Sequence, residues 1–368
     1  MFNLQRKPLL ALISSLATLS TIYTANAFAQ DSAAVKNTEI TVGALRFTSH
    51  AATFVALERG YFKQQGLDVK LKFFQAAQPM AVAVASKDVD YAVTAMSGGL
   101  ISLADKGAIK IIGGSLSEDP KVSGQKIVVS NKAFESGVTD PSKLDGKTWA
   151  ISQKGSSFHY VGAQIEAQDH ITMHFKPLQK VGAIIGAMKS GQVDAWSIVP
   201  HIAKPLADAG AVHIIGNVSD YLPNYQVTTI FTSTHNATDE RAQTQAFLTA
   251  IAKGAADYNA AMIDHTAGQQ GEDDMVKLIH KYIYTDQPLD KAAPSIINGS
   301  MRLNADNFLN MASLQNQLDW FQQGKMVNTS IKLTDIVDTS YVKTVDAKSV
   351  AVKSVDKKAI DTKEEATK

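Results

Sequence analysis

A pair of short repeats constrains the fold of this chain more than any other sequence feature. SKDVDYAV at residues 86–93 recurs as SGQVDAWSI at 190–198. LADKGAIKIIGG at residues 103–114 recurs as LADAGAVHIIGN at 206–217. Both matches occur in the same order and at nearly the same spacing, so we expect two domains of like topology.

The segments around each repeat alternate between strand and helix patterns. Repeated strand–helix–strand units with apolar strands indicate parallel sheets that helices cover on both faces. KIVVS at residues 126–130 and YQVTTIFTS at 225–233 lie outside the repeats. We expect the chain to enter the second domain through the first of these strands and to return through the other. The predicted fold class is therefore α/β, with two domains of parallel strands that two crossing strands connect.

The domain boundaries follow from this path. We predict a first part of lobe 1 at residues 38–123, lobe 2 at 124–223, and a second part of lobe 1 at 224–341, including C-terminal helices. From Val342 onward the chain is rich in Lys, Asp, Val and Ala and has no aromatic residue. Such a composition buries no core, so residues 342–368 are predicted to form a flexible, solvated tail.

The N-terminus has the pattern of a secretory signal peptide. Arg6 and Lys7 precede an apolar stretch, which two Ala-x-Ala cleavage signals follow. Cleavage after Ala27 or Ala29 fits, and we favour Ala29. The apolar run is shorter than the roughly 20 residues that a membrane span needs. We therefore expect residues 1–29 to be removed and the mature protein to be periplasmic, soluble and not lipid-anchored.

The composition excludes several function classes. The chain has 368 residues, 45% hydrophobic and 19% charged, with a formal net charge of +1. This near-neutral net charge does not indicate a nucleic-acid-binding protein, which would be strongly basic. The chain has no cysteine, which excludes disulfides, thiolate metal sites and cysteine nucleophiles.

Geometry predicts where a ligand binds. Ligands of open parallel α/β sheets bind beyond the carboxyl ends of the strands, where helix N-termini offer free N–H groups and a partial positive charge. The loops at these places are rich in glycine and hydroxyl residues, with aromatic and cationic side chains between them. They provide the candidate ligand-binding residues Arg46, Thr48, Ser49, His50, Gln75, Ser97, Gly98, Gly155, Ser156, Ser157, Phe158, His159, Trp196, Pro200 and His201.

HAATFVALERGYFKQQGLDVKLKFF at residues 50–74 resembles the signature of nitrate/sulfonate/taurine-type, thiamine-precursor-like solute-binding proteins of ABC importers. The similarity continues through VASKDVDYAV, LADKGAIKIIGG, KLDGKTWAISQKGSS and SGQVDAWSIVP to TDIVDTSYV. The resemblance implies a type II periplasmic-binding-protein fold, in which each lobe has a parallel sheet with one antiparallel crossing strand. Its two lobes close on a small-molecule anion. The resemblance also implies a monomer that works with an inner-membrane permease and its ATPase. The LRFTSH loop and the chain after Tyr341 depart from the family pattern.

Alternative interpretations of the site stay open. Ser156 or Ser157 with His159 could act as nucleophile and base, but the sequence G-S-S-F-H lacks the G-x-S-x-G elbow, and serine is an ordinary helix cap. His170 and His174 have no acidic residue at metal-ligand spacing, so we predict no metal and no cofactor. Arg46 could bind an anion or form a surface ion pair.

The ligand and the partner also have alternatives. Phe47, Phe158 and Trp196 favour an organic anion such as a sulfonate, a taurine-like compound or a carboxylate over an inorganic one. The chain could also be an exported ligand-sensing module, which neighbouring permease and ATPase genes would exclude. An enzyme of the same fold is disfavoured, because the resemblance implies that such relatives depend on cysteines. We predict a binding protein without catalytic residues.

Overall fold

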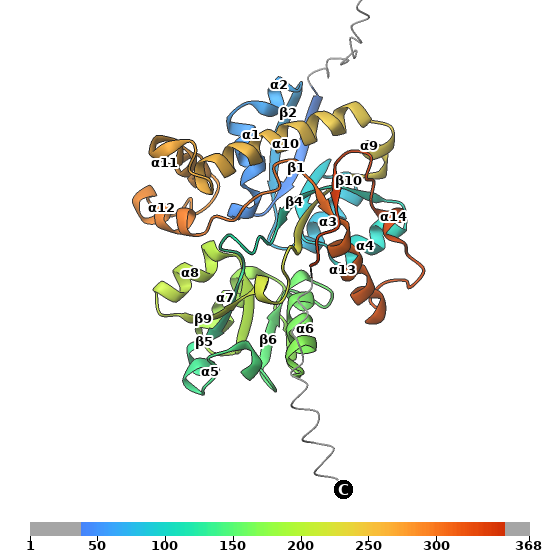
Figure 1. Cartoon of the computed structure of the whole chain (residues 1–368). Helices are drawn as coiled ribbons and strands as arrows, with labels where there is room; N and C mark the ends of the chain where they lie inside the picture. Colours follow the sequence, from blue (N-terminus) through green and yellow to red (C-terminus); the bar gives the residue numbers. More distant parts are fainter. Residues whose placement is uncertain (1–37, 350–368) are drawn as a thin grey trace, which may run out of the picture. The chain divides into compact units, whose positions relative to one another are not determined.

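The computed structural model describes residues 38–349 and contains two five-stranded sheets (Figure 1). The predicted signal peptide, and the predicted tail from residue 350 onward, lie outside the described residues. Each sheet has a set of helices and one antiparallel crossing strand.

The sheet of lobe 1 has the strand order β2-β1-β3-β10-β4. Strand β1 is parallel to β2 and β3, whereas β10 is antiparallel to both β3 and β4. The bounds are β1 Thr38–Ala44, β2 Leu67–Phe73, β3 Tyr91–Thr94, β4 Ile109–Ser117 and β10 Gln226–Ser233.

The sheet of lobe 2 repeats this arrangement with the order β7-β6-β8-β5-β9. Strand β6 is parallel to β7 and β8, and β5 is antiparallel to β8 and β9. The bounds are β5 Lys126–Ser130, β6 Thr148–Ile151, β7 His174–Pro177, β8 Ala195–Ile198 and β9 Val212–Asn217. The antiparallel strands β5 and β10 are those that lie outside the sequence repeats, which confirms the predicted α/β fold class.

Helices follow most of the parallel strands, and a further group follows β10. In the first part of lobe 1 these are η1 Thr48–His50, α1 Ala51–Glu58, α2 Tyr61–Gln64, α3 Ala77–Ala85 and α4 Gly98–Asp105. Lobe 2 has α5 Asn131–Glu135, η2 Pro141–Lys143, α6 Ser157–Asp169, α7 Val181–Lys189, α8 Pro200–Asp208 and η3 Val218–Asp220. After β10 come α9 Thr234–Thr238, α10 Arg241–Met262, α11 Gly268–His280, α12 Leu289–Asn298, β11 Leu309–Asn310, α13 Met311–Gln323, α14 Leu333–Ile336 and β12 Thr344–Val345.

Helix α10 packs closely on α1, which attaches the C-terminal half of lobe 1 to its N-terminal half. At Gly254 a Cβ atom would lie only 2.2 Å from the carbonyl oxygen of Ala52, so only glycine permits this approach. Within residues 38–349, no helix is long and apolar enough to cross a membrane.

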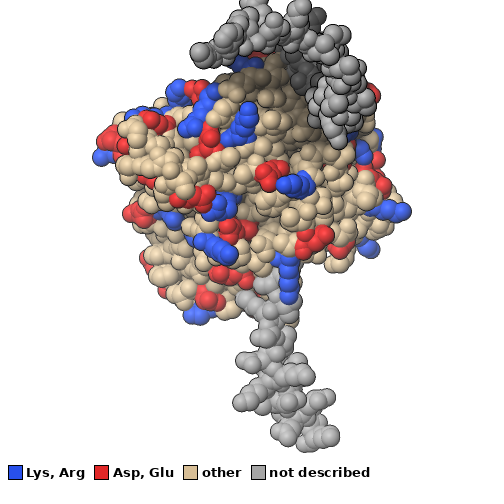
Figure 2. All heavy atoms as spheres, turned by 45° about the horizontal axis from the view of Figure 1, so that its top comes forward, with Lys and Arg blue, Asp and Glu red and all other residues tan. Residues whose placement is uncertain are grey.

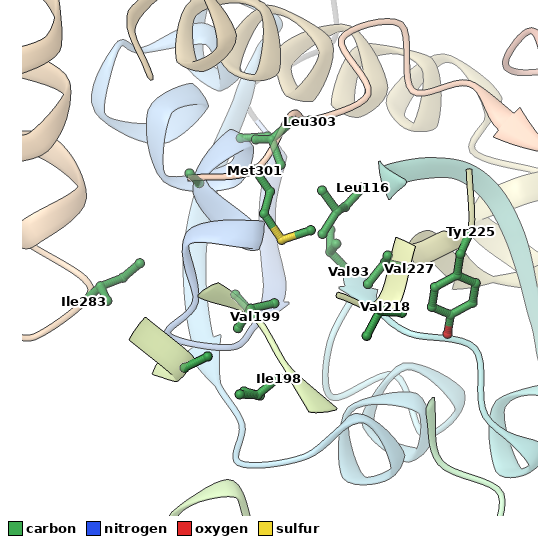
Figure 3. Close-up of a cluster of buried hydrophobic side chains, with 14 of the residues drawn as sticks. Val93, Leu116, Ile198, Val199, Val218, Tyr225, Val227, Ile283, Met301 and Leu303 are labelled. Atoms are coloured by element: carbon green, nitrogen blue, oxygen red, sulfur yellow. The ribbon is translucent and has the colours of Figure 1, made fainter. Parts of the chain in front are cut away.

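A cluster of buried apolar side chains extends across both lobes. Ile198 and Val199, at the end of β8, belong to the same cluster as Val227 of β10 and Met301. Figure 3 shows these side chains beside one another at the junction between the lobes. Burial of apolar surface from both lobes therefore stabilises their contact.

The start of the C-terminal segment differs from the sequence-based prediction. Strand β12 pairs in parallel with β11, the Asn310 side-chain amide donates to the Ala347 carbonyl at 2.8 Å, and Ser349 is buried. Residues 343–349 therefore pack on lobe 1, whereas we predicted a solvated tail from Val342. These contacts are largely backbone and amide hydrogen bonds, which leave no hydrophobic pattern in the sequence.

Candidate functional site

A cavity lies where the two lobes meet, and both crossing segments contribute to its wall. Its volume is about 70 Å3, or about 640 Å3 when the open mouth is included. The smaller value lies below the range of about 300–1,000 Å3 that is typical of small-molecule sites. The lining residues are Leu45, Phe47, Ser49, His50, Gln75, Ala76, Ala77, Thr94, Ala95, Gln125, Ser152, Ser156, Ser157, Phe158, Val181, Ile198, Val199, Val227 and Thr228.

The cavity has a buried end and an accessible mouth. Ser49, Gln125 and Thr228 are buried at the inner end. Gln75 is exposed and Ser157 is half-buried, so both lie nearer to solvent. A ligand would therefore enter beside Gln75 and Ser157 and reach the crossing segments.

No lysine, arginine, aspartate or glutamate lines this cavity. His50 is neutral as well, because burial lowers its pKa to about 3. Its Nδ1 atom accepts a hydrogen bond from the backbone N–H of Leu45 at 3.4 Å, which places the proton on Nε2. The surface drawn in Figure 2, in contrast, shows charges of both signs interspersed. Polar recognition in the cavity thus depends on neutral hydroxyl, amide, imidazole and backbone groups.

Two helix N-termini lie at the cavity wall. Helix α3 follows Ala76, whose side chain cannot cap the helix. The first backbone N–H groups of α3 therefore have no side-chain cap. Helix α6 follows Ser156, whose Oγ accepts the backbone N–H of His159 at 3.4 Å and keeps its own hydroxyl proton to donate. Free N–H groups and the helix dipole favour an anionic or strongly polar group at this position.

Several of the predicted ligand-binding residues instead join the lobes. The backbone N–H of Gly98 donates to the Gly155 carbonyl oxygen at 3.0 Å. Thr48 Oγ1 donates to the Gly299 carbonyl at 3.1 Å and therefore accepts from Nδ1 of His201 at 3.0 Å. His201 is fully buried, and burial together with the nearby His50 lowers its pKa to about 3. These contacts hold lobe 1 against lobe 2.

Other predicted residues point elsewhere. The Arg46 guanidinium lies 3.9 Å from the centre of the Phe73 ring and donates to the Tyr282 carbonyl at 2.8 Å. Trp196 is completely buried in the core. Ser97 caps α4 by accepting the backbone N–H of Leu100. Among the predicted residues, those outside the cavity wall are Arg46, Thr48, Ser97, Gly98, Gly155, His159, Trp196, Pro200 and His201.

The predicted residues that the fold brings together at the cavity are Ser49, His50, Gln75, Ser156, Ser157 and Phe158. Ligand contact by these residues stays a prediction. Gln125 and Thr228 also line the cavity and are absent from the predicted set, because the crossing segments are interpreted there only as connectors. A signal was available, since a strand that passes between two lobes must run beneath the cleft that separates them.

The arrangement of His159 does not favour a nucleophile–base pair. Its Nδ1 atom accepts the backbone N–H of Gly155 at 3.0 Å, and its ring packs 5.0 Å from that of Trp320. Burial, with a smaller effect of Lys154, lowers its pKa to about 4. In the part of the chain that the structure describes, no group of three or more His, Cys, Asp or Glu residues is placed to hold a metal ion.

Two lobes of like topology, connected by crossing segments around a cleft, define the periplasmic binding protein fold. Residues 47–261, more than half of the chain, match the family model described as NMT1/THI5 like. The chain belongs to this family. No curated protein sequence matches it.

Solved structures confirm the fold. The alkanesulfonate-binding protein SsuA from Xanthomonas axonopodis pv. citri bound to MOPS has a TM-score of 0.65 and 16% identity, covering 83% of this chain and 99% of that one. The periplasmic aliphatic sulphonate binding protein SsuA from Escherichia coli has a TM-score of 0.62 and 16% identity, covering 86% and 96%. The periplasmic nitrate-binding protein NrtA from Synechocystis PCC 6803 has a TM-score of 0.64 and 11% identity, covering 82% and 86%.

Proposed function

We propose that this chain is the periplasmic solute-binding protein of an ABC importer, which delivers a small organic ligand to an inner-membrane permease and its ATPase. The observation that carries the proposal is the cavity between the lobes, whose wall includes residues of both crossing segments. Sulfonate- and nitrate-binding proteins of the same fold support it. The protein binds and releases its ligand and catalyses no reaction.

The ligand in this proposal is a small organic molecule with a sulfonate or carboxylate head group. The N-termini of α3 and α6, with the hydroxyls of Ser156 and Ser157, offer donors to that group without a formal positive charge. Phe158 and Ile198 offer apolar surface to its carbon skeleton. Closure of the lobes about the crossing segments would exclude water from the bound ligand.

Native mass spectrometry of protein purified without denaturation tests the proposal by identifying a retained ligand. Ala77→Trp fills the mouth of the cavity, and we expect it to lower the affinity for that ligand at least tenfold in calorimetric titration. Ala85→Trp, at the other end of α3, is the matched control and should bind as the wild type does. Equal affinities of wild type and Ala77→Trp would exclude the cavity as the binding site.

A further inference from the structure

Glu118 is a buried carboxyl group between the lobes. It directly follows β4 and is only 1% exposed. Its backbone N–H donates to the carbonyl oxygen of Tyr225, in the returning segment, at 2.8 Å. Glu118 therefore lies where the two connections between the lobes touch.

The carboxylate of Glu118 binds Gln125 at two points. Oε1 accepts the backbone N–H of Gln125 at 3.1 Å and its side-chain Nε2 at 3.0 Å. A Cβ atom on Gly124 would lie 1.8 Å from Oε2 of Glu118, so the backbone folds tightly over the carboxylate. The hydrogen bond from Nε2 directs the Gln125 side-chain amide toward Glu118.

That orientation has a chemical consequence, because a carboxylate only accepts hydrogen bonds. Gln125 must turn its NH2 group to Glu118, which leaves its carbonyl oxygen available to accept a hydrogen bond, and Gln125 is one of the residues that line the cavity. We propose that Glu118 is a positioning residue that aims this oxygen at the ligand, and that the site therefore selects ligands with an N–H or O–H donor besides their anionic head group. The inference rests on the proposed function and narrows its ligand class.

The neighbouring wall supports this assignment. No acidic side chain lines the cavity, so a donor on the ligand meets neutral acceptors there. Thr228 also lines the buried end, and its Oγ1 atom has no hydrogen-bond partner among the described residues. A buried hydroxyl without a partner is costly, and a polar group of the ligand would satisfy it.

The protonation state of Glu118 controls the orientation. The pKa of Glu118 is raised to about 7, mainly by burial and to a smaller extent by the charge of Asp119. The hydrogen bonds from Gln125 and the charge of Lys126 act in the opposite direction. Asp119 itself pairs with Arg302 at 3.2 Å, and the buried Tyr225 is the titratable group from the returning segment. A protonated Glu118 can donate to Gln125, which lets the amide turn and removes the acceptor from the cavity.

Calorimetric titration with paired probes tests the inference. Taurine and 1-propanesulfonate share a sulfonate and differ in an ammonium or a methyl group, and β-alanine and butyrate form the matching carboxylate pair. At pH 8 we expect wild type to prefer the donor-bearing member about tenfold or more. Glu118→Gln should lower this preference about fivefold, because it weakens one hydrogen bond, that between the ligand and Gln125. Asp119→Asn is the control, since it also replaces a carboxyl group by an amide, at the next residue in the chain. It should retain the preference.

A pH series and a second variant complete the design. Between pH 8 and 6 the preference should fall in wild type and stay constant in Glu118→Gln. Gln125→Leu removes the acceptor and leaves the carboxyl group of Glu118 in place. It should lose the preference at every pH, and it tests the inference if Glu118→Gln does not fold. Equal wild-type affinities within both pairs, or a retained ligand without any donor, would overturn the inference while leaving the binding function intact. Wild-type protein that binds none of the probes and retains no ligand would refute the proposed function itself.

Discussion

The side-chain carboxylate of Asp90 accepts the backbone N–H of Thr41 at 2.7 Å and thereby connects the start of β3 to β1. Asp194 makes the same bond to Thr148 in lobe 2, at 2.8 Å, between β8 and β6. Both aspartates belong to the Val-Asp pair of the sequence repeat. That part of the repeat is therefore structural, and it positions the parallel strands from which the cleft loops emerge.

Replacing either aspartate should weaken its own lobe. A hydrogen bond to a charged acceptor contributes about 1.5–3 kcal/mol, so we expect Asp90→Ala and Asp194→Ala each to lower the free energy of unfolding by that amount. Urea denaturation measures it. Asp88→Ala, at an exposed position beside Asp90, is the control and should cost less than about 0.5 kcal/mol. A loss below about 0.5 kcal/mol in Asp90→Ala would show that its hydrogen bond to Thr41 contributes little to stability.

The serines at the start of α6 should contribute to ligand binding. Both line the cavity, and Ser156 also caps the helix. We expect Ser156→Ala/Ser157→Ala to weaken binding of the retained ligand about tenfold and to cost about 1 kcal/mol of stability. Calorimetry and denaturation separate the two effects. Ser97→Ala removes a cap outside the cavity wall and should lose stability alone. Unchanged affinity in the double variant would leave these serines with a capping role only.

The contact between Thr48 and His201 should favour the closed arrangement of the lobes. Thr48→Val leaves Nδ1–H of His201 buried without its acceptor when the lobes are in contact, at a cost of about 1–3 kcal/mol. We expect a larger radius of gyration in X-ray scattering without ligand, and a weaker affinity. Thr53→Val, buried in α1, is the control. Identical scattering of wild type and Thr48→Val, with and without ligand, would contradict this closure.

The two buried histidines should each lower the stability of the protein in mild acid. Unfolded histidine binds a proton below about pH 6.5, whereas buried His50 and His201 stay neutral in the folded protein down to about pH 3. The unfolded state thus binds more protons between these values, and stability falls as the pH falls. Each histidine should cost about 2 kcal/mol between pH 7 and 5. Urea denaturation at both pH values checks this, since His201→Gln should reduce the loss by about 2 kcal/mol. Equal losses in both proteins would refute it.

The packed segment before residue 350 should stabilise lobe 1. We expect deletion of residues 343–368 to lower the melting temperature by about 5 °C or more relative to deletion of 350–368. The longer deletion removes β12 and the amide hydrogen bonds to Ala347 and Lys348. Thermal unfolding followed by circular dichroism compares the two. Equal melting temperatures would show that these contacts contribute no stability.

The fold class could be predicted from the sequence because the patterns that indicate strands and helices are local. The period of apolar residues marks each strand and helix, and the repeated order of elements predicts two sheets of like topology. The position of KIVVS and YQVTTIFTS outside the repeats was enough to assign β5 and β10 as the crossing strands. Loops at strand ends also identified much of the cavity wall, since that property follows from topology.

The direction of individual side chains was decided by tertiary structure. Arg46 and His50 lie four positions apart in one loop, yet Arg46 turns to Phe73 and Tyr282 while His50 lines the cavity. Glu118 and Gln125 show no motif in the sequence. Their side chains bond each other where the backbone of Glu118 also contacts Tyr225 of the returning segment. Side-chain direction depends on neighbours that distant segments supply. The sequence alone therefore determined the elements and their order, and only the folded chain decided which polar groups face the ligand.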